Sequence, residues 1–332
     1  MKPLIDVQNL TLLFDTDEGR ITAVDDVSFS IMPGEIMGLV GESGSGKSVT
    51  AKSLMYLNAP NANYADESKI LLNTEDVSLD VLKLTTQKQR NVVRGGAISM
   101  IFQEPMASFA PAISIGKQMV EQLLLHTDMS KAQCKELSIE MLDRVGISDA
   151  SSRFNQYAFE LSGGMRQRAM IAMALSTKPK LLIADEPTTA LDVTIQAQVI
   201  DLMRELVDEF RMGILFITHD LGVIAQTADK VAVMYLGRIV EQGLVRDVIR
   251  TPSHPYTQGL LAALPKMDDL ESPLKPIPGD IPSPLERPTG CVFNTRCGQV
   301  VGDVCRSKTP AWTETSKDHF GACHLYTNEV NG

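Results

Sequence analysis

The feature that most constrains the fold is a glycine-rich stretch near the start, Gly41-Glu-Ser-Gly-Ser-Gly46-Lys47-Ser48. It fits the phosphate-loop pattern, it follows an apolar run from Ile36 to Val40, and it precedes a helix-compatible stretch. Glycines in this position let backbone N–H groups turn inward around phosphates. The order of strand, loop and helix therefore predicts an α/β fold that binds a nucleotide. A glycine-rich turn without a ligand is the alternative.

The pattern also assigns roles within this stretch. We expect Lys47 to reach the β and γ phosphates of ATP and the Ser48 hydroxyl to bind Mg²⁺. The expected nucleotide contacts are Gly41, Ser43, Gly44, Ser45, Gly46, Lys47, Ser48 and Val49.

A second strong pattern is Leu181-Leu-Ile-Ala-Asp185-Glu186, an apolar strand that ends in two carboxylates. Asp185 can hold Mg²⁺ through water. Glu186, one residue further, can accept a proton from the water that attacks the γ-phosphate, which makes it the expected general base. The other interpretation is a strand end whose Asp-Glu-Pro sequence only caps the next turn.

Between these motifs, Leu161-Ser162-Gly163-Gly164-Met165 resembles the signature sequence of ABC ATPases. A small hydroxyl followed by bare backbone amides can grip a phosphate at a helix start, so Ser162, Gly163 and Gly164 are expected to contact nucleotide. A plain helix N-cap would have the same residue types.

The resemblance to ABC ATPases extends to single residues around the two motifs. Gln103 in Met100-Ile-Phe-Gln-Glu-Pro105 is similar to the Q-loop glutamine that contacts Mg²⁺ and the attacking water. His219 is similar to the switch histidine that touches the γ-phosphate, and Asp192 closes a D-loop-like Thr-Ala-Leu-Asp sequence. Phe14 is either the aromatic that stacks on adenine or a core aromatic of the first sheet.

The family resemblance also implies how the motifs act together. In ABC ATPases the signature of one subunit closes over the nucleotide that the other subunit holds. The chain is therefore expected to form a head-to-tail dimer around two ATP molecules, either with its own copy or with a paralogue. Glu186, His219 and Gln103 are the expected catalytic residues.

Hydrophobic patterning predicts the domain organisation. Short strand-like runs at the start predict a first set of strands, and continuous apolar runs at Leu181–Ala184 and Ile214–Ile217 predict a mostly parallel core sheet. The resemblance to ABC ATPases implies that the first strands form an ABC-type β-subdomain. Helical spacing from Ile113 to Val145 predicts a helical insertion at about 106–160. We place the nucleotide-binding domain at 1–250. Repeated prolines after Arg250 predict a linker and a small irregular module at 251–332.

Cysteines gather in this last region, at Cys291, Cys297, Cys305 and Cys323. Their spacing, C-x5-C-x7-C-x17-C, differs from the paired C-x2-C of zinc ribbons. Four thiolates in a chain expected in the cytosol nevertheless suit an iron-sulfur cluster. The stretches His254-Pro-Tyr-Thr257 and Arg287-Pro-Thr-Gly-Cys291 resemble the C-terminal extension of oligopeptide and dipeptide importer ATPases, some of which carry a [4Fe-4S] cluster. Structural zinc and free thiols remain alternatives.

Composition and charge limit the classes of partner that the chain is expected to bind. A formal net charge of -10 argues against a general nucleic-acid binder. No apolar run approaches bilayer length and the first residues lack a signal-peptide pattern, so the chain is expected in the cytosol. The resemblance implies a peripheral position on the cytoplasmic face of the inner membrane, with two integral-membrane permeases and an extracytoplasmic solute-binding protein.

The resemblance leaves the transported substrate open. Peptides or similar small solutes are expected, with oligosaccharides and nickel chelates as alternatives for the same cassette. A non-transport ABC ATPase that acts on nucleic acid or ribosomes is the other class, but the chain has neither a second cassette nor a long coiled coil.

Overall fold

The computed structural model describes residues 2–75, 78–187, 193–264 and 276–327. They divide into two compact units, each of which is built from separate stretches of the chain. The first unit contains Met1–Ile5, Ser30–Glu35 and Leu71–Ile217. The second contains Asp6–Phe29, Ile36–Ile70 and Thr218–Gly332.

The first unit contains a group of parallel strands. β8 (Leu181–Asp185) pairs in parallel with β7 (Ile98–Ile101) and β9 (Gly213–Thr218). All residues of these strands are buried, as the continuous apolar runs in the sequence predict for strands covered on both faces. Both runs expected as parallel strands are therefore confirmed. Parallel pairing also brings the carboxyl ends of β7 and β8 to one edge.

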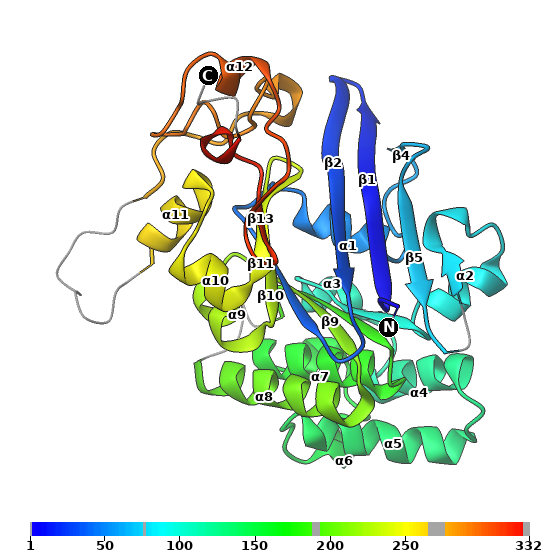
Figure 1. The fold of residues 1–332 in the computed structure, drawn as a ribbon. Coiled ribbons are helices and arrows are strands. Elements are labelled where there is room, and N and C mark those ends of the chain that lie inside the picture. Colours follow the sequence, from blue (N-terminus) through cyan, green and yellow to red (C-terminus); the bar gives the residue numbers. More distant parts are fainter. Residues whose placement is uncertain (1, 76–77, 188–192, 265–275, 328–332) are drawn as a thin grey trace. The chain divides into compact units, whose positions relative to one another are not determined.

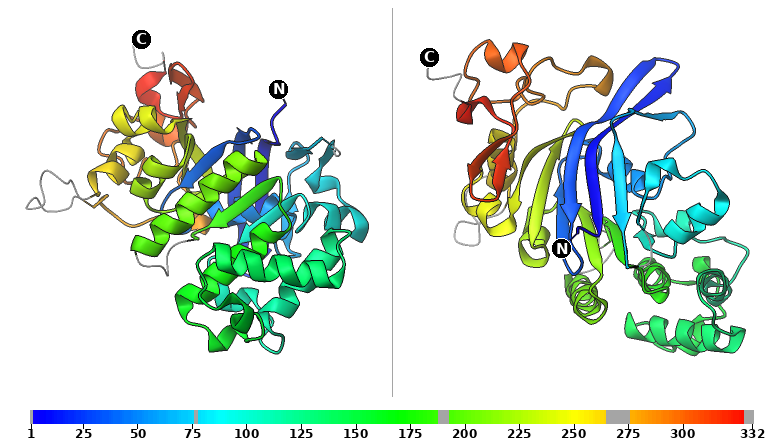
Figure 2. Two further views of the ribbon diagram at one scale, coloured as in Figure 1. Left: turned by 90° about the horizontal axis from the view of Figure 1, so that it is seen from below. Right: turned by 45° about the vertical axis from the view of Figure 1, so that its right-hand side comes forward.

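Helices make up most of the remaining first unit (Figures 1 and 2). α4 (Ile115–His126) and α5 (Lys131–Arg144) pack on each other and on α7 (Gly163–Ser176). The stretch expected to be helical is thus two helices, with a break at which Ser130 begins α5 through a capping box. The other elements are β6 (Ser78–Asp80), α2 (Gln87–Val93), α3 (Pro105–Ser108), α6 (Ala150–Arg153) and α8 (Val193–Phe210).

The second unit begins with strands, as the apolar residues of the first 31 positions predict, and these strands are longer than the short runs expected. It contains β1 (Ile5–Thr16), β2 (Gly19–Ile31) and β4 (Ala62–Tyr64), and β4 pairs antiparallel with β1. β5 (Lys69–Asn73) spans the boundary between the units. β3 (Ile36–Val40) leads into α1 (Lys47–Ser53) and pairs in parallel with β10 (Lys230–Tyr235). The phosphate loop therefore lies between a buried strand and a helix, as predicted.

Short elements precede and follow β10 in the chain. α9 (Leu221–Thr227) precedes β10, β11 (Arg238–Leu244) forms an antiparallel hairpin with it, and α10 (Val245–Arg250) and α11 (Pro255–Ala262) follow (Figure 1). The region beyond residue 250 is not wholly irregular. β13 (His319–Gly321) adds antiparallel to β11, followed by β12 (Thr313–Ser316), while α12 (Val304–Ser307) lies among the cysteines.

A buried carboxylate fixes this C-terminal region. Glu241 of β11 has no exposed surface and accepts hydrogen bonds from the backbone N–H groups of Ser253 and His254 and from the Ser253 hydroxyl. The His319 ring lies 2.7 Å from the same carboxylate. A buried carboxylate needs several such partners, so Glu241 ties the start of the linker to β13. In the part of the chain that the structure describes, no helix is both long and apolar enough to span a bilayer.

Candidate functional site

The glycine-rich loop between β3 and α1 depends on glycine at a defined position. Gly46 precedes α1 with φ of 101°, a conformation that side chains disfavour. A Cβ atom there would lie 2.6 Å from the Ala23 carbonyl oxygen. The loop can therefore pass close to β2 only because residue 46 has no side chain.

Lys47 places its ammonium group inside the curve of this loop. Its Nζ donates to the carbonyl oxygens of Gly41 at 2.7 Å and Glu42 at 2.9 Å, and it lies 3.3 Å from the Ser45 hydroxyl. Lys47 and Ser45 are buried, Ser43 and Gly44 are exposed, and Ser48 and Val49 are half-buried. The structure thus brings the predicted phosphate-binding residues together around one cationic group.

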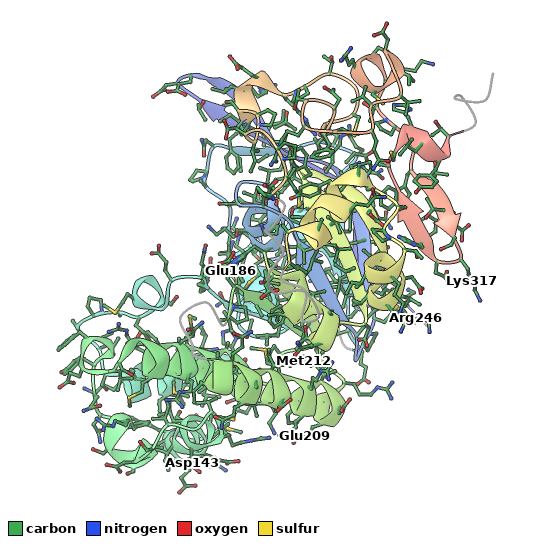
Figure 3. The ribbon with its side chains drawn as sticks, turned by 90° about the vertical axis from the view of Figure 1, so that its left-hand side faces the viewer. Asp143, Glu186, Glu209, Met212, Arg246 and Lys317 are labelled. Carbon is green, nitrogen blue, oxygen red and sulfur yellow. The ribbon has the colours of Figure 1, made fainter. Side chains whose placement is uncertain are left out.

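In the first unit the predicted carboxylates lie at the end of β8. Asp185 is the last residue of the strand and only 4% exposed. Glu186, labelled in Figure 3, has φ of +49°, which is uncommon for a residue with a side chain and is a feature of functional sites. Gln103, which follows β7, donates from Nε2 to Glu186 Oε2 at 3.1 Å. The structure therefore joins two of the three expected catalytic residues.

The signature-like sequence begins α7. Ser162 is the N-cap, and its hydroxyl accepts from the Met165 backbone N–H at 3.3 Å. Ser162 and Gly163 are exposed and Gly164 is half-buried. The N-cap interpretation is therefore correct locally, and the exposed start of the helix leaves the phosphate-binding interpretation open.

Gln167 is a residue of this helix that sequence reasoning missed. It is 1% exposed, and its side-chain amide donates to the carbonyl oxygen of Pro187, directly after Glu186. This hydrogen bond links α7 to the turn that follows β8. A polar residue on the otherwise apolar face of α7 was the available signal.

The remaining predicted residues occupy separate places. His219 is exposed directly after β9, and the next residue, Asp220, caps α9 through the Gly222 N–H. Phe14 is half-buried near the end of β1, where it pairs with Ala62 of β4. Asp192 lies outside the described residues. The glycine-rich loop, Phe14 and His219 belong to the second unit, and the residues of α7 and β8 to the first.

The oxygen donors expected to bind Mg²⁺ have suitable chemistry. The Ser48 hydroxyl, the Asp185 carboxylate and the amide oxygen of Gln103 are hard ligands of the kind that Mg²⁺ takes, usually with several waters retained. The near-complete burial of Asp185 favours a charge partner at that strand end.

The four C-terminal cysteines lie within electrostatic range of one another. Burial, with a smaller contribution from the neighbouring thiols, raises the pKa of Cys291 to about 12 and that of Cys323 to about 11. Backbone N–H groups point at the sulfurs: Gln299 donates to Cys297 at 3.3 Å and Val301 to Cys305 at 3.4 Å. All are free thiols. Among the described residues, no three or more His, Cys, Asp or Glu side chains are arranged to hold a single metal ion.

The C-terminal region also reaches the glycine-rich loop, which sequence reasoning did not foresee. The hydroxyl of Tyr256 and the guanidinium of Arg296 both bind Glu42, the second residue of that loop. Tyr256 belongs to the His254-Pro-Tyr-Thr257 stretch, so a sequence signal marked that region without indicating what it touches.

Comparisons with known proteins identify the family of the chain. A family model described as ABC transporter matches residues 24–189, and a model described as oligopeptide/dipeptide transporter, C-terminal region, matches residues 240–305. The oligopeptide transport ATP-binding protein OppD of Salmonella typhimurium is 48% identical over 92% of this chain and 89% of its own length. The oligopeptide transport ATP-binding protein AppD of Bacillus subtilis is 45% identical over 99% and 98%.

Solved structures agree on the fold. A dimeric ATP-binding cassette in a post-hydrolysis state with ADP and Pi matches with a TM-score of 0.65, at 24% identity over 73% of this chain and 99% of that chain. CbiO1 of Clostridium perfringens matches with a TM-score of 0.61, at 24% identity over 76% and 92%. The expected ABC cassette fold is thereby confirmed. The chain belongs to the ABC transporter ATP-binding subunits of the oligopeptide/dipeptide importer type.

Proposed function

We propose that this chain hydrolyses ATP to power the import of peptides through membrane partners. The observation that carries the proposal is the Gln103–Glu186 hydrogen bond at the carboxyl ends of β7 and β8, next to the buried Asp185. It places a carboxylate base and an amide that can orient water side by side, which suits attack of water on a phosphate. Near-full-length similarity to oligopeptide transport ATP-binding proteins supports peptides as the cargo.

In the proposed reaction, each group of the chain has one role. Lys47 and the backbone N–H groups of the loop hold the β and γ phosphates. Glu186 takes a proton from water whose oxygen bonds to the γ-phosphorus, while the bond to the ADP oxygen breaks. Gln103 orients that water, and His219 contacts the γ-phosphate. Mg²⁺, bound at Ser48 and Asp185, would neutralise charge on the phosphates.

The site is proposed to be completed by a second ATPase subunit, either a copy of this chain or a paralogue. Ser162, Gly163, Gly164 and Asp192 of one subunit would contact the nucleotide held by the other, so that ATP binding closes the pair and hydrolysis opens it. We place the nucleotide-binding domain at 1–250, with a helical part at about 106–160, and the C-terminal extension at 251–332. Two integral-membrane permeases and an extracytoplasmic binding protein would join the pair on the cytoplasmic face of the membrane.

The cargo can be tested in the assembled transporter. The chain, reconstituted with its permease and binding-protein partners, should hydrolyse ATP faster when a library of short peptides is supplied with the binding protein. Oligosaccharides and nickel chelates supplied in the same way serve as comparisons. Stimulation by one of those solutes and not by peptides would contradict the proposed cargo while leaving the ATPase assignment intact.

We further propose that Cys291, Cys297, Cys305 and Cys323 hold a [4Fe-4S] cluster. The proximity of the four thiols and the N–H donors at their sulfurs support it, because such hydrogen bonds are typical of cluster sites. A cluster would supply the positive charge that lets buried thiols ionise.

This cluster predicts a defined metal content. Protein purified without oxygen should contain about four iron and four sulfide per chain, and Cys297→Ser should lose most of both. Cys134→Ser is the matched control, because Cys134 is buried in α5 and belongs to another part of the chain. Iron-free protein with bound zinc, or iron content equal in both variants, would contradict the cluster.

A further inference from the structure

The carboxylate of Glu42 is held by an arginine that lies 254 residues further along the chain. Arg296 Nη1 donates to Glu42 Oε2 at 2.7 Å and Nη2 donates to Oε1 at 3.2 Å. This two-pronged geometry is the strongest form of an arginine–carboxylate pair. The Arg296 side chain is only 4% exposed and that of Glu42 is 27% exposed, so the pair is partly shielded from the solvent screening that weakens surface ion pairs.

Arg296 is itself rigidly placed. Its Nε donates to the Pro278 carbonyl oxygen at 3.1 Å, and its guanidinium lies 5.8 Å from the centre of the Tyr235 ring. Burial lowers the pKa of Arg296, but hydrogen bonds to Glu42 and Tyr235 more than offset that effect and raise it. The side chain is therefore a fixed cation, and its position is set by the C-terminal extension.

Tyr256 binds the backbone of the same loop residue, Glu42. The Glu42 N–H donates to the Tyr256 hydroxyl oxygen at 2.9 Å. Tyr256 has no exposed surface, and its ring packs between those of Tyr235, at 4.7 Å, and Phe293, at 5.3 Å between centroids. A phenol fixed in this aromatic cluster cannot follow the loop if the loop moves.

Glu42 also contacts Lys47, the residue that is proposed to bind phosphate. Its carbonyl oxygen accepts from Lys47 Nζ at 2.9 Å, so both ends of the residue are fixed between Lys47 and the C-terminal extension. Glu42 also adds a negative charge to a loop that binds an anion. Without a nearby cation, that charge would repel the phosphates.

We propose that Arg296 and Tyr256 are positioning residues of the ATP site: the C-terminal extension fixes the phosphate loop through Glu42 and neutralises the Glu42 carboxylate. This inference rests on the proposed ATP binding at the loop. It gives the extension a direct part in nucleotide affinity, in addition to any role of its cysteines. Neither residue touches the reacting atoms, so both should affect ATP binding more than the chemical step.

The test measures ATP affinity and turnover of the full chain separately. Arg296→Met should raise the KM for ATP and the Kd of a fluorescent trinitrophenyl ATP about tenfold, because a charge-assisted pair is lost and Glu42 is left uncompensated. Its kcat should stay within about threefold of the wild type. Tyr256→Phe, which removes only the hydroxyl, should raise the same Kd by about threefold.

Two further variants separate positioning from folding. Arg306→Met is the matched control, because Arg306 is an arginine of the same extension next to a cysteine but is 67% exposed, and its Kd should equal that of the wild type. Glu42→Gln combined with Arg296→Met should recover most of the lost affinity, since the uncompensated charge is gone. If Arg296 only stabilised the fold, the melting temperature would fall both in Arg296→Met and in the double variant, and the double variant would not regain ATP affinity.

The outcomes are distinct. An unchanged Kd in Arg296→Met, or a raised Kd that Glu42→Gln fails to recover, overturns the inference. Wild-type protein that binds no ATP at all would instead overturn the proposed function. A raised Kd that recovers in the double variant supports the role of Arg296.

Discussion

Glu186→Gln is expected to lower the kcat of ATP hydrolysis by about 10²–10⁴-fold, the usual contribution of a general base. The amide has nearly the shape of the carboxylate and keeps an oxygen that can accept the Gln103 hydrogen bond, so the local geometry should survive. What is lost is the ability to take the proton of the attacking water. ATP affinity should therefore remain near the wild-type value, and the closed dimer should persist. Single-turnover hydrolysis and equilibrium ATP binding measure the two effects separately.

Glu209→Gln provides the control for this substitution. Glu209 lies on α8, away from Glu186 in Figure 3, and forms an exposed ion pair with Arg144 at 3.4 Å. Exposed pairs of this kind contribute little to stability, so its turnover should match the wild type. Glu186→Gln protein that hydrolyses ATP at the wild-type rate would refute the assignment of Glu186 as the base.

Lys47→Ala is expected to weaken ATP binding by about 10–100-fold, because a charge-assisted hydrogen bond to a phosphate is worth about 1.5–3 kcal/mol. The same change removes the donor that bridges the Gly41 and Glu42 carbonyl oxygens, so the loop should lose part of its shape as well. Hydrolysis at limiting ATP should fall by at least the same factor. Titration with a fluorescent ATP analogue measures the affinity.

Lys52→Ala is the matched control for the loop lysine. Lys52 is on the same helix, α1, but is exposed and belongs to its last turn. Its removal should leave ATP affinity unchanged. Equal affinities in both variants and the wild type, with melting temperatures unaltered, would show that Lys47 does not bind the nucleotide.

Local patterns explain why so much of the site could be predicted from the sequence. A phosphate loop needs glycine where the backbone turns and a lysine at fixed spacing, so the loop could be predicted from residues 41–48 alone. The end of β8 is similar, because an apolar run followed by two carboxylates predicts both a buried strand and its polar end. The Gln103–Glu186 contact depends on the parallel pairing of β7 with β8, which the apolar runs do not indicate by themselves.

Contacts between residues far apart in the sequence could not be predicted from such local patterns. The ion pair between Glu42 and Arg296 joins two residues whose neighbours give no sign of each other, since neither periodicity nor spacing relates positions so far apart. The pairing of β13 with β11 could not be predicted either, because β13 is only three residues long and follows a proline-rich stretch. Burial of Glu241 depends on donors from two further segments, which only the folded chain reveals.

The central claim is that two cassettes hold ATP between the phosphate loop of one and the signature turn of the other. The most direct measurement is a structure of the assembled importer carrying Glu186→Gln, determined with Mg²⁺ and ATP. The account predicts two nucleotides at the interface between the ATPase subunits, with Lys47 on the phosphates of one and Ser162 on the phosphates of the other. Nucleotide bound to separated cassettes, with Ser162 facing solvent in each, would contradict it.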